Sequence, residues 1–165
     1  MAQDITLPIE DGFVNLRVGA IIQKGGKLLL VGNAKNDYDY SVGGRIRFGE
    51  TAEEAVVREV REETGRALAI DRLGFVHENY FYGDIPGVNR DRLIYEVSFY
   101  FYMKVPEDFE PVGESATDEG RVRETMQWVS PDDPRTIYPE FYRTELRRPE
   151  MTVKHFVTDE RGAGA

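Results

Sequence analysis

Apolar residues alternate with polar ones, or form short continuous runs, in several stretches of the chain. Such patterns predict β-strands, because successive side chains of a strand point to opposite faces of its sheet. The stretches are residues 14–23, 27–31, 40–42, 68–82, 92–104, 123–129 and 153–157. Gly25 and Gly26 predict a tight turn between the first two strands. Residues 33–39 and 106–120 are predicted loops, and the tail from residue 159 is expected to be frayed.

A helical period replaces the alternation between Thr51 and Thr64. Thr51 and Glu54 have the spacing of a capping box, in which each side chain satisfies a free backbone amide at the helix start. Gly65 stands where a left-handed C-terminal cap is expected. The sequence therefore predicts a helix with both ends defined.

One stripe of this helix is predicted to face the core. Its members are Val56, Val57, Val60 and Thr64. A second, short helix is predicted over residues 139–146. Strands and helices do not alternate regularly, so we expect an α+β fold with helices packed on a mixed sheet, in a single domain over residues 1–165.

Composition excludes several classes of site. A net charge of −9 argues against a nucleic-acid-binding protein, because such proteins present a basic face to the phosphates. The absence of cysteine excludes disulfides, thiolate metal sites and cysteine nucleophiles. No stretch approaches the roughly 18 apolar residues of a membrane span, and no signal peptide is apparent. A soluble cytoplasmic protein is therefore expected.

Three carboxylates, Glu59, Glu62 and Glu63, share one face of the predicted helix because they lie three and four residues apart. Like charges at this spacing repel, and the simplest interpretation is a solvated acidic surface. The cluster, however, directly follows a glycine-bearing loop, where backbone can approach a ligand closely. Oxygen ligands of this kind favour Mg²⁺ or Mn²⁺, which would turn the repulsion into coordination.

These residues belong to a longer pattern that resembles the Nudix box. The box consists of Gly, five residues, Glu, seven residues, and then Arg-Glu-apolar-x-Glu-Glu-x-Gly-apolar. The matching positions are Gly44, Glu50, Arg58, Glu59, Val60, Glu62, Glu63 and Gly65. Departures occur at Val42, Arg47 and Arg66, where the family often has proline, an acidic residue and an apolar residue. None of them removes a metal-ligand position.

The resemblance implies an α/β/α sandwich with a central mixed sheet, and divalent-metal hydrolysis of a nucleoside diphosphate linked to another group. By analogy, Glu59, Glu62 and Glu63 hold Mg²⁺ or Mn²⁺ and serve in catalysis, with Gly44 and Glu50 as further members of the metal site. Glu50 supports either the helix or the metal shell. Arg58 orients a carboxylate.

The general base is left open between the helix carboxylates and two loop candidates, Glu119 and Glu124, each of which is otherwise an ordinary exposed glutamate. Arg45 and Arg47 contact substrate phosphates or are solvated loop arginines. We expect His77 to be a strand-face residue rather than a catalyst.

Aromatic runs at residues 78–82 and 99–102 are expected mainly to pack in the core rather than to stack on a base. The alternative function is a non-catalytic Nudix-fold sensor or regulator. Partners implied by the family are a small nucleotide-type diphosphate and a second copy of the chain in a homodimer.

Overall fold

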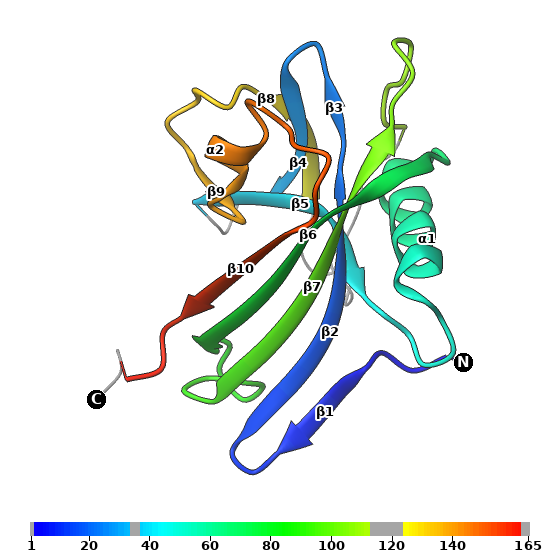
Figure 1. Cartoon of the computed structure of the whole chain (residues 1–165). Coiled ribbons are helices and arrows are strands. Elements are labelled where there is room, and N and C mark those ends of the chain that lie inside the picture. Colours follow the sequence, from blue (N-terminus) through cyan, green and yellow to red (C-terminus); the bar gives the residue numbers. More distant parts are fainter. Residues whose placement is uncertain (1, 34–36, 113–123, 163–165) are drawn as a thin grey trace.

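A strongly twisted sheet separates α1 (Ala52–Thr64) from α2 (Tyr142–Glu145), the two helices of the described residues (Figure 1). The computed structural model describes residues 2–33, 37–112 and 124–162. The elements in chain order are β1 (Thr6–Ile9), β2 (Gly12–Ile21), β3 (Gln23–Lys24), β4 (Lys27–Asn33), β5 (Tyr38–Arg45), α1 (Ala52–Thr64), β6 (Ala69–Tyr82), β7 (Leu93–Lys104), β8 (Glu124–Val129), β9 (Thr136–Tyr138), α2 (Tyr142–Glu145) and β10 (Lys154–Asp159).

The sheet is mixed, as predicted. The described strands follow the order β10-β6-β7-β2-β5-β4-β3, with β1 beside β2, β8 beside β4 and β9 beside β5. Three pairs are parallel (β2 with β7, β6 with β10, β5 with β9) and the others are antiparallel. The α+β prediction, with helices packed on a mixed central sheet, is confirmed.

Strand β5 belongs to both halves of this sheet. Its residues 42–45 pair with β2, whereas residues 38–41 pair with β4 and β9. Gly43 and Gly44 lie in the part of β5 that runs beside β2. Because β5 passes from one half of the sheet to the other, Gly43 and Gly44 place backbone without side chains at the centre of the molecule.

Both ends of α1 are fixed as the sequence predicts. The Thr51 hydroxyl accepts from the Glu54 amide at 3.2 Å, and the Glu54 carboxylate accepts from the Thr51 amide at 2.8 Å. Gly65 adopts a left-handed conformation with φ of 69°, and its amide donates to the Arg61 carbonyl.

The predicted core stripe of α1 is wrong at one position. Val56, Val60 and Thr64 are fully buried, together with Ala55, but Val57 is 36% exposed. At about 100° per residue, the arc from Ala55 to Thr64 also contains positions 59 and 63, and Val57 lies just beyond one edge of it. The helix therefore buries the side that carries two of its carboxylates.

Three strands were not predicted as separate elements, and one was predicted too short. β1 and β9 lack a clear apolar pattern, and β3 is separate from β2 although residues 14–23 were predicted as one strand. β5 spans Tyr38–Arg45 instead of residues 40–42. The early start follows from Asp39, which is buried and accepts from Arg135 at 2.7 Å and from Gln127 at 3.2 Å. The polar residues at the start of β5 can form a strand because the buried carboxylate of Asp39 is hydrogen-bonded.

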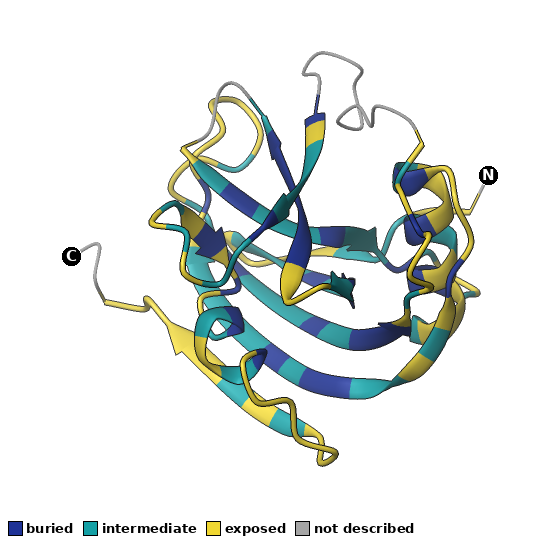
Figure 2. Ribbon diagram, turned by 90° about the horizontal axis from the view of Figure 1, so that it is seen from above, coloured by how far each residue is buried: buried dark blue, intermediate teal, exposed yellow. Residues whose placement is uncertain are grey.

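The remaining elements agree with the predictions at their centres. Helix α2 lies within residues 139–146, and β10 is an edge strand that extends to Asp159, which is therefore not part of a frayed tail. Apolar side chains form one cluster between α1 and the sheet and a second around α2. Figure 2 shows buried stretches, in dark blue, along strands of the sheet and on α1. In the described part of the chain, neither helix has the length and apolar character that a membrane-spanning helix requires.

Replacement of Thr51 by Ala removes the hydroxyl that caps α1 and leaves the Glu54 amide without its partner. We expect a loss of about 1 kcal/mol in the free energy of unfolding, measured by urea titration. Thr51→Ser keeps the hydroxyl and is the matched control. Equal stability of Thr51→Ala and the parent protein would contradict the assigned cap.

Candidate metal and diphosphate site

Glu59 reaches from α1 across the glycines of β5. A Cβ atom placed on Gly44 would lie 2.5 Å from the carboxyl carbon of Glu59, closer than any side chain can approach. Gly44 is therefore required for Glu59 to occupy this position. The space between helix and strand is filled by a carboxylate instead of an apolar residue.

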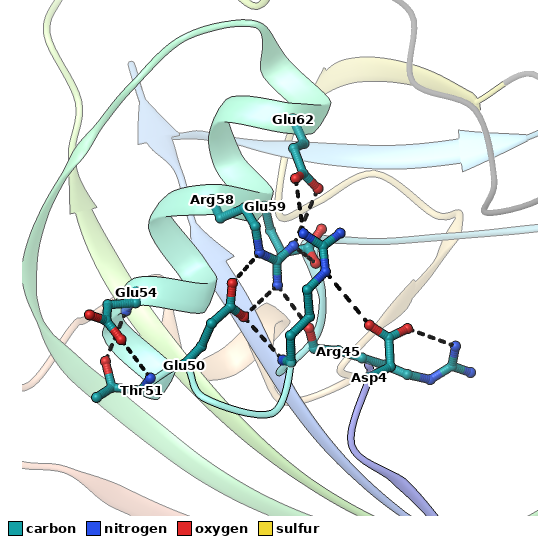
Figure 3. Close-up of polar contacts among 9 residues, drawn as sticks. Asp4, Arg45, Glu50, Thr51, Glu54, Arg58, Glu59 and Glu62 are labelled. Carbon is teal, nitrogen blue, oxygen red and sulfur yellow. Dashed lines mark hydrogen bonds and ion pairs between the residues drawn. The ribbon is translucent and has the colours of Figure 1, made fainter. Parts of the chain in front are cut away.

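Arg58 joins the loop that precedes α1 to the helix itself (Figure 3). Its Nε and one terminal nitrogen donate to the two oxygens of Glu50 at 2.6 and 2.8 Å. Its other terminal nitrogen donates to Glu59 at 2.5 Å and to Glu62 at 3.2 Å. The carbonyl of Arg45 accepts a further bond at 3.1 Å. Arg58 thus contacts the carboxylates of Glu50, Glu59 and Glu62 at once.

Glu50 is occupied by protein donors. Besides Arg58, the backbone amide of Arg47 donates to its carboxylate at 3.0 Å. The hydrogen bonds from Arg58, reinforced by the Arg47 amide, lower the pKa of Glu50 to about 2. This arrangement favours a supporting role at the helix start over direct contact with a metal.

Arg45 and Arg47 lie at the rim of the same site, where both approach Asp4 at 3.8 Å. Arg47 also contacts Glu62 at 3.4 Å. Asp4 was not predicted, because the backbone contacts that bring the N-terminal segment here join residues far apart in the sequence. They are the bridge of Asp4 to Arg47 and the hydrogen bonds from Ile5 to Ile46 and from Phe48 to Gln3. The two arginines are therefore placed beside the carboxylates and already paired with anions.

Glu63 is the most deeply placed carboxylate of the helix. Its Oε2 is buried and has no hydrogen-bond partner among the described residues. Burial, followed by the charges of Glu59 and Glu124, raises its pKa to about 9. Burial also raises the pKa of Glu59, against the opposing effect of Arg58. A buried oxygen without a partner beside other carboxylates is the environment in which a cation binds most favourably.

Glu124 joins this group from β8, whereas Glu119 lies outside the described residues. Glu124 is only 8% exposed, so it is not an ordinary surface glutamate. The hydroxyl of Tyr40 donates to its carboxylate, and its charge acts on Glu63. The contribution of Tyr40 was not predicted, because the sequence does not show that β5 and β8 flank the same strand, β4.

These side chains line one cleft of about 540 Å³. The candidates that line it are Glu59, Glu62, Glu63, Gly44, Arg45, Arg47 and Glu124, whereas Glu50 and Arg58 do not line it. Its far side consists of residues that sequence analysis did not assign to the site, including Arg17, Asn79 and Glu96. His77 lines it as a buried strand residue, and burial lowers the pKa of its imidazole to about 4. The aromatic run at residues 99–102 of β7 packs in the two core clusters, as expected. The expectation is wrong for the run at residues 78–82 of β6, whose aromatic residues belong to neither cluster and whose Tyr82 is 40% exposed.

Comparison with known proteins places this cleft in a family. The NUDIX domain model matches residues 15–149. The chain belongs to the Nudix family.

The curated relatives match only part of the chain. An ADP-ribose pyrophosphatase of Methanocaldococcus jannaschii is 47% identical over 51 residues, covering 29% of this chain and 30% of the relative. A MutT-like protein of Streptomyces ambofaciens is 38% identical over 61 residues, covering 37% and 40%. The matches thus span less than half the length of either relative.

Solved structures share the fold at low identity. An ADP-ribose pyrophosphatase from Streptococcus suis superimposes with a TM-score of 0.55 at 19% identity, over 86% of this chain and 98% of that one. A nudix hydrolase family member from Chromobacterium violaceum gives 0.52 at 24% identity, over 88% and 84%. These similarities establish the Nudix fold of this chain.

The donor chemistry of the Nudix box fits a hard divalent cation. Glu63 offers an oxygen without a partner, and Glu59 and Glu62 lie on the same helix. Within the described residues, no three His, Cys, Asp or Glu side chains are gathered into a ready-made metal site. The physical reason is that Arg58 and Arg47 draw Glu59 and Glu62 toward themselves.

Replacement of Glu50 by Gln should destabilise the protein in a pH-dependent way. The folded-state pKa of Glu50, about 2, lies below the ordinary value of 4.5. Its contribution is therefore present above about pH 4.5 and is lost as the pH falls toward 2. Urea unfolding of parent and variant across this range should show the difference in free energy shrinking with acidification. Glu53→Gln, an exposed glutamate of the same helix, is the control.

Replacement of Glu63 by Gln should stabilise the metal-free protein. A folded-state pKa of about 9 means that the ionised form is penalised by folding. The stability linked to protonated Glu63 is complete below pH 4.5 and declines as the pH rises toward 9. The advantage of Glu63→Gln should therefore grow with pH in urea titrations with EDTA. An advantage that does not change with pH would contradict the buried environment assigned to Glu63.

Proposed function

We propose that this Nudix domain hydrolyses a diphosphate linkage in a nucleoside diphosphate joined to another group, with Mg²⁺ or Mn²⁺ as its cofactor. The observation that carries the proposal is the buried, partnerless oxygen of Glu63, which faces Glu59 and Glu124 in a cleft. Such a group of carboxylates is unfavourable in a protein without a bound cation.

Glu59, Glu62 and Glu63 would hold the divalent ion, near the glycine backbone at Gly44. When bound, such an ion neutralises phosphate oxygens and lowers the pKa of water. Arg58 keeps Glu59 and Glu62 oriented and anchors them to Glu50. This network positions the metal ligands before a substrate arrives.

Two further groups have roles in the proposed reaction. Arg45 and Arg47 lie at the cleft rim, where guanidinium groups can bind the phosphates in exchange for their long contacts to Asp4. Glu124 is a candidate general base, because it lines the cleft and the Tyr40 hydroxyl fixes its carboxylate. The box carboxylates are the alternative source of the base.

The substrate belongs to the class that the names of the relatives suggest. ADP-ribose pyrophosphatase and MutT-like protein are the names of the curated relatives, and one structural neighbour is a UDP-X diphosphatase. A nucleotide-type diphosphate is common to the substrates under consideration: nucleoside triphosphates, ADP-ribose and nucleotide sugars. We further propose a cytoplasmic protein and a homodimer, to be tested by cell fractionation and by light scattering of the purified chain.

Glu62→Gln and Glu63→Gln should each lower turnover by about 100-fold or more, because each removes a negative ligand from the proposed metal site. The assay is nucleotide and phosphate release from nucleoside triphosphates, ADP-ribose and nucleotide sugars, with Mg²⁺, with Mn²⁺ and with EDTA. Glu53→Gln, on the exposed side of α1, should retain the parent rate.

Turnover by either variant at the parent rate would reject the assignment of these residues. Metal-dependent binding of a nucleotide without turnover by the parent protein would favour the alternative, a Nudix-fold sensor.

A further inference from the structure

The cleft has a polar floor that the diphosphate chemistry does not use. It is formed by β6, β7 and β2, which lie side by side in the sheet. The strand register places Asn79, Glu96 and Asn15 in one row across the three strands. Residues paired across neighbouring strands point to the same face. Asn79 and Glu96 line the cleft, whereas Asn15 is buried beside Glu96 and does not line it.

The next row on this face consists of His77, Ser98 and Arg17, two positions further along each strand. His77 and Ser98 are buried, and all three line the cleft. Two adjacent rows of polar side chains are unusual on a covered sheet face, where apolar residues are the rule.

Several groups of the first row lack partners within the protein. The Oδ1 atoms of Asn15 and Asn79 are buried without a hydrogen bond among the described residues. The carboxylate of Glu96 is 16% exposed, and its nearest cation, Arg17, stays at 3.9 Å, beyond hydrogen-bond distance. In the described part of the chain, no hydrogen bond to this carboxylate is present. Polar groups left unsatisfied in a cleft indicate that a ligand completes them.

Arg17 connects this floor to the metal side of the cleft. Its pKa is raised mainly by Glu96, against the effect of burial, and also by Glu63 and Glu59. A ligand with its diphosphate at Glu59 and Glu63 therefore has its next group over the floor. The rings of Tyr38 and Tyr138, 5.2 Å apart and edge to face, line the same cleft and offer a surface for stacking.

We propose that the floor around Glu96 recognises a guanine-type base, one that presents two neighbouring N–H donors beside a carbonyl oxygen. The inference rests on the proposed function of this cleft and names the nucleoside part of its substrate. An ionised carboxylate only accepts hydrogen bonds, and its two oxygens match the N1–H and N2–H groups of guanine. The Oδ1 atom of Asn79, the neighbour of Glu96 on β6, is an acceptor without a partner and matches the second hydrogen of the 2-amino group.

The other bases match less well. Adenine places a ring-nitrogen acceptor beside its single amino group, and cytosine does the same. Uracil flanks its one N–H with two carbonyl oxygens. In each case a lone pair of the base would face the negative charge of Glu96, which costs binding free energy instead of supplying it.

Titration calorimetry with GMP, IMP and AMP in the presence of Mg²⁺ tests the proposal. These monophosphates have no anhydride bond, so the titration measures binding without turnover. IMP differs from GMP only by the missing 2-amino group. The parent protein should bind GMP about tenfold more tightly than IMP or AMP, because a site built for a donor discriminates against its absence.

Glu96→Gln should abolish the preference for GMP over IMP, because an amide presents one acceptor and one donor group where the carboxylate presents two acceptors. Glu78→Gln is the matched control: Glu78 precedes Asn79 on β6 and therefore points to the opposite face. This control should keep the preference. Thermal unfolding of each variant verifies that it is folded.

Equal binding of the three nucleotides by the parent protein, tighter binding of AMP, or no binding of any of them would overturn the proposal. Retention of the GMP preference in Glu96→Gln would overturn it as well. If Glu96→Gln does not fold, the affinities of the parent protein for GMP and IMP still test whether the cleft recognises the 2-amino group of guanine. The titration measures binding without turnover. A failure to hydrolyse substrate would therefore not affect the test of base recognition, and a failure of base recognition would not affect the test of hydrolysis.

Discussion

The repulsion between carboxylates that one helix buries against a sheet is the constraint on which the rest of the site depends. Glu59 and Glu63 lie on the arc of α1 that also carries Val56 and Val60 into the core, so folding desolvates both acids. Arg58 offsets part of this cost through its contacts to Glu59 and Glu62, and Glu50 in turn holds Arg58 in place. Glu63 takes no part in the contacts of Arg58. Its negative charge must therefore be neutralised by a proton or by a bound cation.

Much of this arrangement was predictable because it is local in the sequence. Helix bounds, both caps and the shared face of Glu59, Glu62 and Glu63 follow from spacings of three and four residues. The bidentate pairing of Arg58 with Glu50 was not predicted, since an eight-residue separation through a loop does not determine a contact.

The remainder of the site depends on long-range pairing that periodicity does not encode. Tyr40 meets Glu124 only because β5 and β8 both flank β4, and Asp4 meets Arg47 through a single bridge. Val57 was misassigned because the period of the helix defines a stripe but not its edges, and the buried arc turned toward the acids. Residues 113–123, which include Glu119, lie outside the described structure, so that candidate stays a prediction.

The chemistry and the floor of the cleft come from different elements of the fold. The carboxylates are carried by α1 and reach the cleft over the side-chain-free backbone at Gly43 and Gly44, whereas Asn79, Glu96 and their neighbours belong to strands of the sheet. Under the proposed function, substitutions on the cleft face of those strands can change which ligand is accepted while the carboxylates on α1 stay unchanged. A library of variants confined to positions 77, 79, 96 and 98 would therefore alter ligand selectivity and leave the proposed metal ligands on α1 in place.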